Sequence, residues 1–177
     1  MSCRFYLNSG KGKKAKQGHP WIYTDEIDAY DGEYKNGDVV EVYSAKEEFL
    51  GKGYINDASK IAIRLLTKNI DEEINHEFFK SRFEDAWNYR KDVIDTSSCR
   101  FIFGEADFLP GLTVDKYEDY YVIQISTLGM DRYRDIIVEL LKSEYGARGI
   151  YERSDILPEN WRVWSRKKAF LQNPSIQ

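Results

Sequence analysis

The sequence predicts an α+β protein in which a small β-barrel precedes a compact α+β domain. Short apolar runs separated by turn residues fill the first part of the chain, and helical spacing of apolar residues begins near residue 70. Strand, strand and helix patterns then follow to about residue 156. We therefore expect a barrel at residues 1–69, an α+β domain at residues 70–156 and a tail at residues 157–177.

The barrel is expected from strands that strong turn signals separate. Asp31-Gly32 and Asn36-Gly37 are dipeptides typical of tight turns, and Gly18-His19-Pro20 interrupts the chain before Trp21. The expected strands cover residues 4–7, 21–23, 39–43, 49–55 and 61–66. Closure into a barrel would hide the sheet edges that so small a domain otherwise exposes.

The second domain begins with a predicted helix. Its apolar residues at helical spacing are Ile74, Phe78, Phe83, Ala86 and Trp87, in a segment that ends near Val93. Asp71 or Asn75 is expected to cap its start. Strands are predicted at 101–103, 112–114 and 120–126, and a second helix over 133–141 is closed by Gly146.

Composition excludes several classes of protein. With 42% hydrophobic and 32% charged residues the chain is not expected to be disordered. It is not expected to span a membrane either, because no apolar run approaches the length of a membrane helix. Its two cysteines lie far apart and form no metal-binding spacing. We expect a cytoplasmic protein.

Charge is distributed unevenly along the chain. The formal net charge is -4, yet residues 1–24 hold five bases and no acid. These bases are Arg4, Lys11, Lys13, Lys14 and Lys16. The segment is either a handle for phosphate or a solvated basic loop, and charge alone does not separate the two interpretations.

A formal nucleotide-binding fingerprint occurs in this basic segment and is rejected. Residues 10–15 match G-x-G-x-x-G/A, a motif that works only where a helix opens at the loop. Gly18 and Pro20 are expected to forbid such a helix, so we predict a basic turn or strand.

No catalytic residue and no metal site is predicted. Cys3 is expected at a fraying terminus, and Cys99 has no neighbour that would make it reactive. Glu105, Asp107 and Asp115 fit no metal spacing, so fixing the backbone of a turn is their expected role. His76 is expected on a helix surface without a special role, and His19 is expected to order the turn before Pro20.

The basic and aromatic residues suggest RNA binding. Lysines are suited to follow a phosphate backbone, while aromatic faces stack on unpaired bases. Trp21 on a strand is also a core candidate. The predicted RNA-binding residues are Lys11, Lys13, Lys14, Lys16, His19, Trp21 and Arg64.

Several blocks resemble a known family. The runs at residues 18–23, 37–40, 49–54 and 59–64 resemble the N-terminal PUA domain of bacterial 23S rRNA cytosine-5 methyltransferases, which are SAM-dependent. Residues 100–107, 109–117 and 149–155 resemble the α+β middle domain of the same family. Phe108 stands where that family usually has glycine.

The resemblance implies an RNA-binding front part of an enzyme, without the Rossmann domain that holds SAM and the catalytic cysteine. No cofactor is therefore expected in this chain, and the expected partner is RNA, in particular ribosomal RNA. The alternatives are a stand-alone RNA-binding or protein-interaction adaptor, and a small enzyme that uses Glu105, Asp107 and Asp115. No membrane partner is expected, and a homodimer stays open.

The tail stops resembling the family at about Leu157. Read one base out of phase, codons from Pro158 onward can encode RKLEGLEPKKGFL, which is close to the family's continuation. A frameshift is therefore hypothesised, and Trp161 and Trp164 would then never have been selected for packing.

Overall fold

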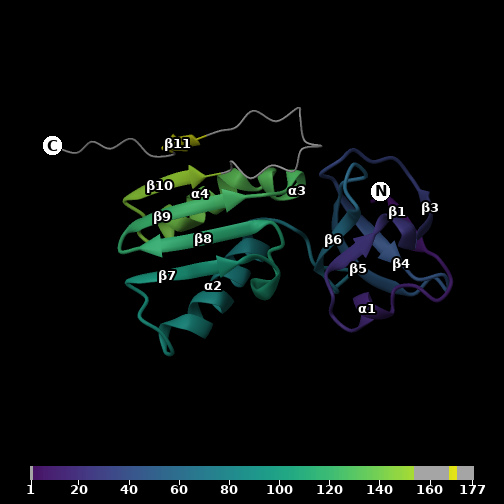
Figure 1. Cartoon of the computed structure of the whole chain (residues 1–177), viewed down its shortest axis with the longest axis horizontal. Helices are drawn as coiled ribbons and strands as arrows, with labels where there is room; N and C mark the ends of the chain where they lie inside the picture. The colour runs from purple at the N-terminus through teal and green to yellow at the C-terminus, as the bar shows by residue number, and fades with distance from the viewer. Residues whose placement is uncertain (1, 154–167, 171–177) are drawn as a thin grey trace. The chain divides into compact units, whose positions relative to one another are not determined.

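The computed structural model describes residues 2–153 and 168–170 (Figure 1). The chain forms two compact units, Met1–Glu72 and Glu73–Gln177. The predicted fold class, a barrel-like sheet followed by a small α+β domain, is confirmed. Trp161 and Trp164 of the predicted tail lie outside the described residues.

The first unit is a six-stranded sheet in the order β2-β6-β5-β4-β1-β3. The strands are β1 (Arg4–Leu7), β2 (Trp21–Tyr23), β3 (Ile27–Asp31), β4 (Val39–Tyr43), β5 (Phe49–Ile55) and β6 (Ile61–Thr67). All except β3 were predicted. Every residue of β3 after Ile27 is exposed, so this strand lacks the alternation of buried and exposed residues by which a sequence reveals a strand.

A short link between the two edge strands makes the sheet curl. β2 and β3 stand at opposite ends of the sheet order, yet only the 3-10 turn η1 (Thr24–Glu26) separates them in the chain. Four residue steps span at most about 14 Å, so the two edges must approach each other. The backbone N–H of Asn8 holds this turn by donating to the Glu26 carbonyl at 2.8 Å.

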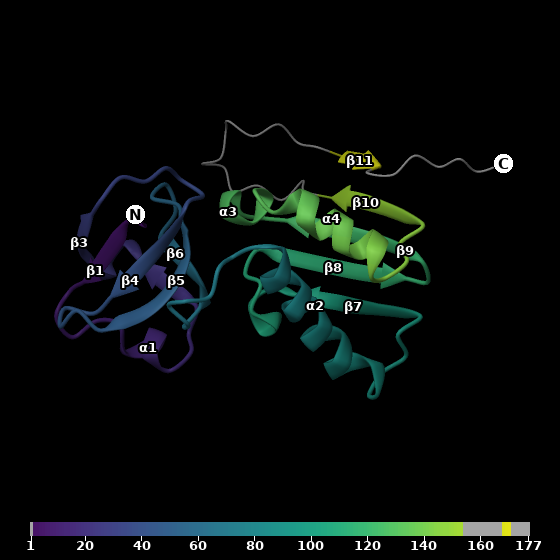
Figure 2. The same ribbon diagram turned by 180° about the vertical axis from the view of Figure 1, so that it is seen from behind.

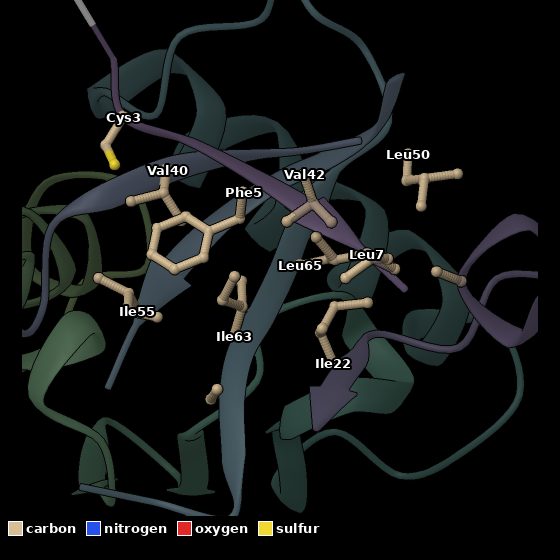
Figure 3. Packing of buried hydrophobic residues seen from close by; sticks show 12 residues of the cluster. Cys3, Phe5, Leu7, Ile22, Val40, Val42, Leu50, Ile55, Ile63 and Leu65 are labelled. Carbon is tan, nitrogen blue, oxygen red and sulfur yellow. The ribbon is translucent and has the colours of Figure 1, made fainter. Parts of the chain in front are cut away.

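The core of this unit fills the inside of the curled sheet. Phe5, Val40 and Val42 are at most 2% exposed, and Figure 3 shows their side chains converging with those of Ile63. The prediction that Cys3 lies at a fraying terminus was wrong, because it is 3% exposed and belongs to this core. Its carbonyl accepts a hydrogen bond from the backbone N–H of Glu41 at 2.9 Å, which extends the pairing of β1 with β4.

The basic segment contains a helix that the sequence analysis had excluded. Helix α1 (Lys13–Lys16) opens directly after Gly12, which has a φ of 82°. The helix forms because Ala15, 1% exposed, packs into the core of the unit. Gly18 and Pro20 therefore limit the helix to one turn but do not forbid it. One turn is too short for the phosphate site of the fingerprint.

The second unit is a five-stranded sheet in the order β11-β10-β9-β8-β7. The strands are β7 (Ser98–Phe103), β8 (Leu112–Tyr117), β9 (Tyr120–Ile125), β10 (Gly149–Arg153) and β11 (Lys168–Phe170). Helices α2 (His76–Lys91) and α4 (Arg134–Ser143) lie on one face of the sheet (Figures 1 and 2), and α3 (Leu128–Asp131) precedes α4. β10 runs parallel to β9 and was not predicted as a strand.

Helix α2 begins where its capping residue allows. Of the two predicted caps, Asn75 is used, since its side-chain Oδ1 accepts the backbone N–H of Phe78 at 3.1 Å. Phe78, Phe79 and Phe83 then bury one face of the helix. His76 was expected to have no special role, but its Nε2 lies 2.7 Å from Oε2 of Glu139 on α4. The two helices are therefore linked at this point.

We predict that Asn75→Ala lowers the free energy of unfolding by about 1 kcal/mol, because the first turn of α2 loses its cap. Urea unfolding followed by circular dichroism measures this. Asn88→Ala, at an exposed position inside the same helix, is the control and should leave stability unchanged or slightly raised. Equal losses in both variants would contradict the capping role.

Candidate nucleic-acid interface

The first unit has a basic cavity of about 310 Å³. It is lined by Ser9, Gly10, Lys11, Lys13, Lys16, Ser44, Ala45, Lys46 and Glu48. These described lining residues include four lysines and a single acid. Three of the lysines were predicted from the sequence, whereas Lys46 was missed. We call this the lysine cavity.

Parallel pairing of two strands brings the lysines together. β1 pairs with β4 in parallel, with Tyr6 opposite Tyr43. Parallel neighbours end at the same edge of a sheet, so the loop that follows β1 and the turn that follows β4 lie side by side. The first carries Lys11 and leads into α1, and the second carries Lys46. Lys46 was missed because sequence spacing does not reveal this pairing.

The turn that carries Lys46 is held by one buried hydroxyl. Ser44 is 7% exposed, and its Oγ accepts the backbone N–H groups of Lys46 and Glu48, each at 3.2 Å. The Ser44 N–H donates to the Glu48 carbonyl at 2.8 Å. These bonds fix the backbone of Lys46 while its side chain stays exposed.

Two of the cavity lysines form exposed ion pairs. Lys11 Nζ lies 3.2 Å from Oδ2 of Asp25, and Lys16 Nζ pairs with Oε2 of Glu48. The hydrogen bond from Lys16 lowers the pKa of Glu48. Such pairs contribute little stability because water and salt screen them. A stronger polyanion can therefore replace the carboxylates at small cost.

The other lysines of this segment and of the facing turn form no ion pair in the described part of the chain. Within residues 2–153, no ion pair involves Lys13, Lys14 or Lys46. Lys13 and Lys46 line the cavity, while Lys14 lies on the same helix but does not line it. The positive charge of the cavity is thus only partly neutralised by the protein.

His19, Trp21 and Arg64 form a second group, on β2 and β6. Trp21 lies directly opposite Arg64 in the pairing of the two strands, so their side chains share one face of the sheet. The His19 and Trp21 rings meet edge to face at 5.4 Å, and His19 Nδ1 accepts the Trp21 N–H at 3.2 Å. All three residues are half-buried. We call this group the β2–β6 patch.

One segment of chain joins the patch to the cavity. The backbone N–H of His19 donates to the carbonyl of Lys14 in α1, at 3.0 Å. None of the patch residues lines the lysine cavity itself. All predicted residues except Lys14 therefore fall into two groups, and Lys14 lies on the helix α1 that links them.

Two of the three acids considered for an alternative enzyme form ion pairs. Asp107 forms an ion pair with Arg90, and Asp115 forms one with Arg100, each at 2.8 Å. In the described ranges, no cluster of His, Cys, Asp and Glu is suited to a metal ion. No helix there is long and apolar enough to cross a membrane. The basic groups are the features that point to a ligand.

Comparisons with known proteins match the first unit to a domain family and most of the chain to named relatives. Residues 5–68 match the family model of a PUA-like domain. Ribosomal RNA large subunit methyltransferase I of Pseudoalteromonas atlantica is 36% identical over 159 residues. The enzymes of the same name from Aliivibrio fischeri and Serratia proteamaculans are 35% and 32% identical. Each match covers 88% of this chain but 40% of the relative, so the chain spans less than half of their length.

Solved structures share the fold. A putative SAM-dependent methyltransferase from Streptococcus mutans matches 98% of this chain and 44% of its own, with a TM-score of 0.76 and 22% identity. A putative methyltransferase complexed with SAH matches 87% of this chain and 40% of its own, with a TM-score of 0.74 and 23% identity. These two structures show the shared fold, while the sequence matches confirm the PUA-like domain and the resemblance to ribosomal RNA methyltransferases.

We predict that Ser44→Ala lowers the free energy of unfolding by about 1–2 kcal/mol, because two backbone N–H groups are left without their buried acceptor. Ser9→Ala, at an exposed serine on the facing loop, should have no effect. Urea denaturation of both variants checks this. A Ser44→Ala variant as stable as the unsubstituted protein would show that the hydroxyl does not hold the turn.

Proposed function

We propose that this chain, the PUA-containing portion of a protein related to ribosomal RNA large subunit methyltransferase I, binds ribosomal RNA through the lysine cavity and the β2–β6 patch. The observation that carries the proposal is the gathering of four lysines from two distant segments around one cavity. A PUA-like domain and relatives named for ribosomal RNA support it.

The two groups would contribute differently to binding. Contacts of lysines with phosphates supply affinity without reading sequence, and they position the RNA. Trp21, His19 and Arg64 offer flat faces on which an unpaired base stacks, as is typical of RNA recognition. Since the patch follows directly after α1, a strand of RNA that crosses the cavity would reach it.

The described residues do not fit SAM. A SAM-binding Rossmann domain needs adjacent parallel strands whose carboxyl ends form a crevice. The sheet of the second unit has one parallel pair, β9 with β10, and the glycine fingerprint of the first unit leads into a four-residue helix. We therefore propose that SAM binding and methyl transfer belong to parts of the parent protein beyond this stretch.

The expected reaction at carbon 5 of cytosine needs a thiolate nucleophile. Burial raises the pKa of both Cys3 and Cys99, which disfavours their thiolates. Neither thiol is therefore suited to this role, in agreement with a binding function for this part of the parent enzyme.

A protein that acts on ribosomal RNA is expected in the cytoplasm.

We predict that Lys13→Ala/Lys46→Ala weakens RNA binding at low salt. The slope of log Kobs against log salt should become less steep by about 0.7–0.9 for each phosphate that the variant no longer binds. Fluorescence anisotropy with ribosomal RNA fragments measures this. Glu48→Gln should have the opposite effect and tighten binding, because it frees Lys16 and removes the acid that lines the cavity.

The matched control is Lys35→Ala/Lys60→Ala, which removes the same charge. Lys35 precedes β4 and Lys60 precedes β6, so both lie at the end of these strands opposite to the cavity. This variant should keep the original salt slope. An unchanged slope in the cavity variant, or an equal change in the control, would count against the lysine cavity.

We also predict that calorimetric titration of the 177-residue chain with SAM gives no heat of binding. The physical reason is that each described sheet holds a single parallel pair, β1 with β4 and β9 with β10, whereas a Rossmann domain needs a mostly parallel sheet. Saturable heat with SAM would show that a cofactor site exists in this chain and would overturn the division of labour proposed above.

A further inference from the structure

The second unit has a pocket of about 570 Å³ between α2 and the 3-10 turn η2 (Gly104–Asp107). It is lined by Arg82, Asp85, Ala86, Tyr89, Arg90, Ala106, Asp107 and Phe108. We propose that this pocket holds one unstacked nucleobase of single-stranded RNA. The inference rests on the proposed function and assigns a second RNA contact, separate from the lysine cavity.

The pocket is built on a rigid ion pair. Arg90 grips the Asp107 carboxylate with two hydrogen bonds, Nη1 to Oδ1 at 3.0 Å and Nη2 to Oδ2 at 2.8 Å. The two side chains are 12% and 9% exposed. Arg90 also donates to the carbonyl of Arg100, and Asp107 accepts the backbone N–H of Phe103 at 2.6 Å. The pair thus holds η2 against α2, and the opposite charges of the two side chains cancel.

The residue that follows η2, Phe108, has a strained backbone conformation. Its backbone is left-handed, with φ 58° and ψ 25°, a conformation that bulky side chains rarely adopt. The ring is nevertheless 64% exposed, so burial of the side chain does not compensate the strain. Strain of this kind is characteristic of functional sites. Here it places an aromatic ring at the pocket.

The walls of the pocket match a flat aromatic ligand. Tyr89 is 77% exposed and lines the same pocket as Phe108. The Arg82 guanidinium lies 5.7 Å from the centre of the Phe108 ring and 4.9 Å from that of Phe78. Bases that have left their own stack can stack instead on aromatic rings and guanidinium planes. The volume lies within the range of small-molecule sites.

The charges of the pocket favour a base over a phosphate. Arg90 and Asp107 neutralise each other, and the rest of the lining includes one base, Arg82, and one acid, Asp85. The lysine cavity, by contrast, has an excess of positive charge. A neutral base therefore suits this pocket better than a phosphate does.

The test compares two single-stranded RNAs of equal length, one with bases and one abasic, by their affinity for the full chain. Wild-type protein should prefer the RNA with bases. Tyr89→Ala and Phe108→Gly should each reduce that preference about tenfold, the effect of losing one stacked base. Both should leave the affinity for abasic RNA unchanged.

Phe108→Gly also separates binding from folding. Glycine adopts the left-handed conformation without strain, so this variant should melt at the same temperature as wild type or higher. Tyr117→Ala, which removes a ring that is 53% exposed on β8 and outside the pocket, is the control and should keep the full preference for bases.

The outcomes distinguish this inference from the proposed function. An undiminished preference in both pocket variants overturns the pocket, even if Lys13→Ala/Lys46→Ala makes the salt slope less steep. Loss of the preference in the pocket variants, with no effect of the lysine variant, supports the pocket and contradicts the lysine cavity. No preference for bases in wild type, or saturation of the pocket by a protein partner alone, also overturns the inference.

Discussion

The parallel pairing of β1 with β4 is the constraint on which the basic surface depends. It places the loop after residue 7 beside the turn after residue 43, and thereby turns scattered lysines into one cavity. The pairing is itself secured by the core, because Phe5 and Val42 lie opposite each other and are both buried. Hydrophobic packing on the inside of the sheet therefore determines the arrangement of charge at the ends of its strands.

An acidic protein can bind a polyanion when its positive charge is concentrated. The chain has a net charge of -4, yet four lysines face one cavity whose described lining contains one acid. The ion pairs of Lys11 and Lys16 are exposed, so they are weak and exchangeable. In the second unit, in contrast, the pair of Arg90 with Asp107 is largely buried and holds the turn η2 against helix α2. Exposure thus separates charges that are available to a ligand from charges that shape the fold.

Most strands and both long helices were predictable because turn residues and apolar periodicity mark them locally. β3 was not, since nearly all its residues are exposed, and β10 was obscured by Glu152, which is fully buried beside Arg134. Sequence spacing likewise missed Lys46, whose position depends on a long-range pairing. The one-turn helix α1 was excluded on local propensity, but burial of Ala15 outweighs that propensity. Local signals predicted the elements, whereas the site required tertiary contacts.

Lysine footprinting tests the central claim most directly. Acetylation rates of individual lysines, measured by mass spectrometry with and without a ribosomal RNA fragment, report which amines the RNA covers. The account predicts that Lys46 is protected together with Lys13, although more than thirty positions separate them in the sequence, while Lys35 and Lys60 react as before. Protection of Lys13 without Lys46, or equal protection of all four, would show that the shared cavity is not the surface that RNA contacts.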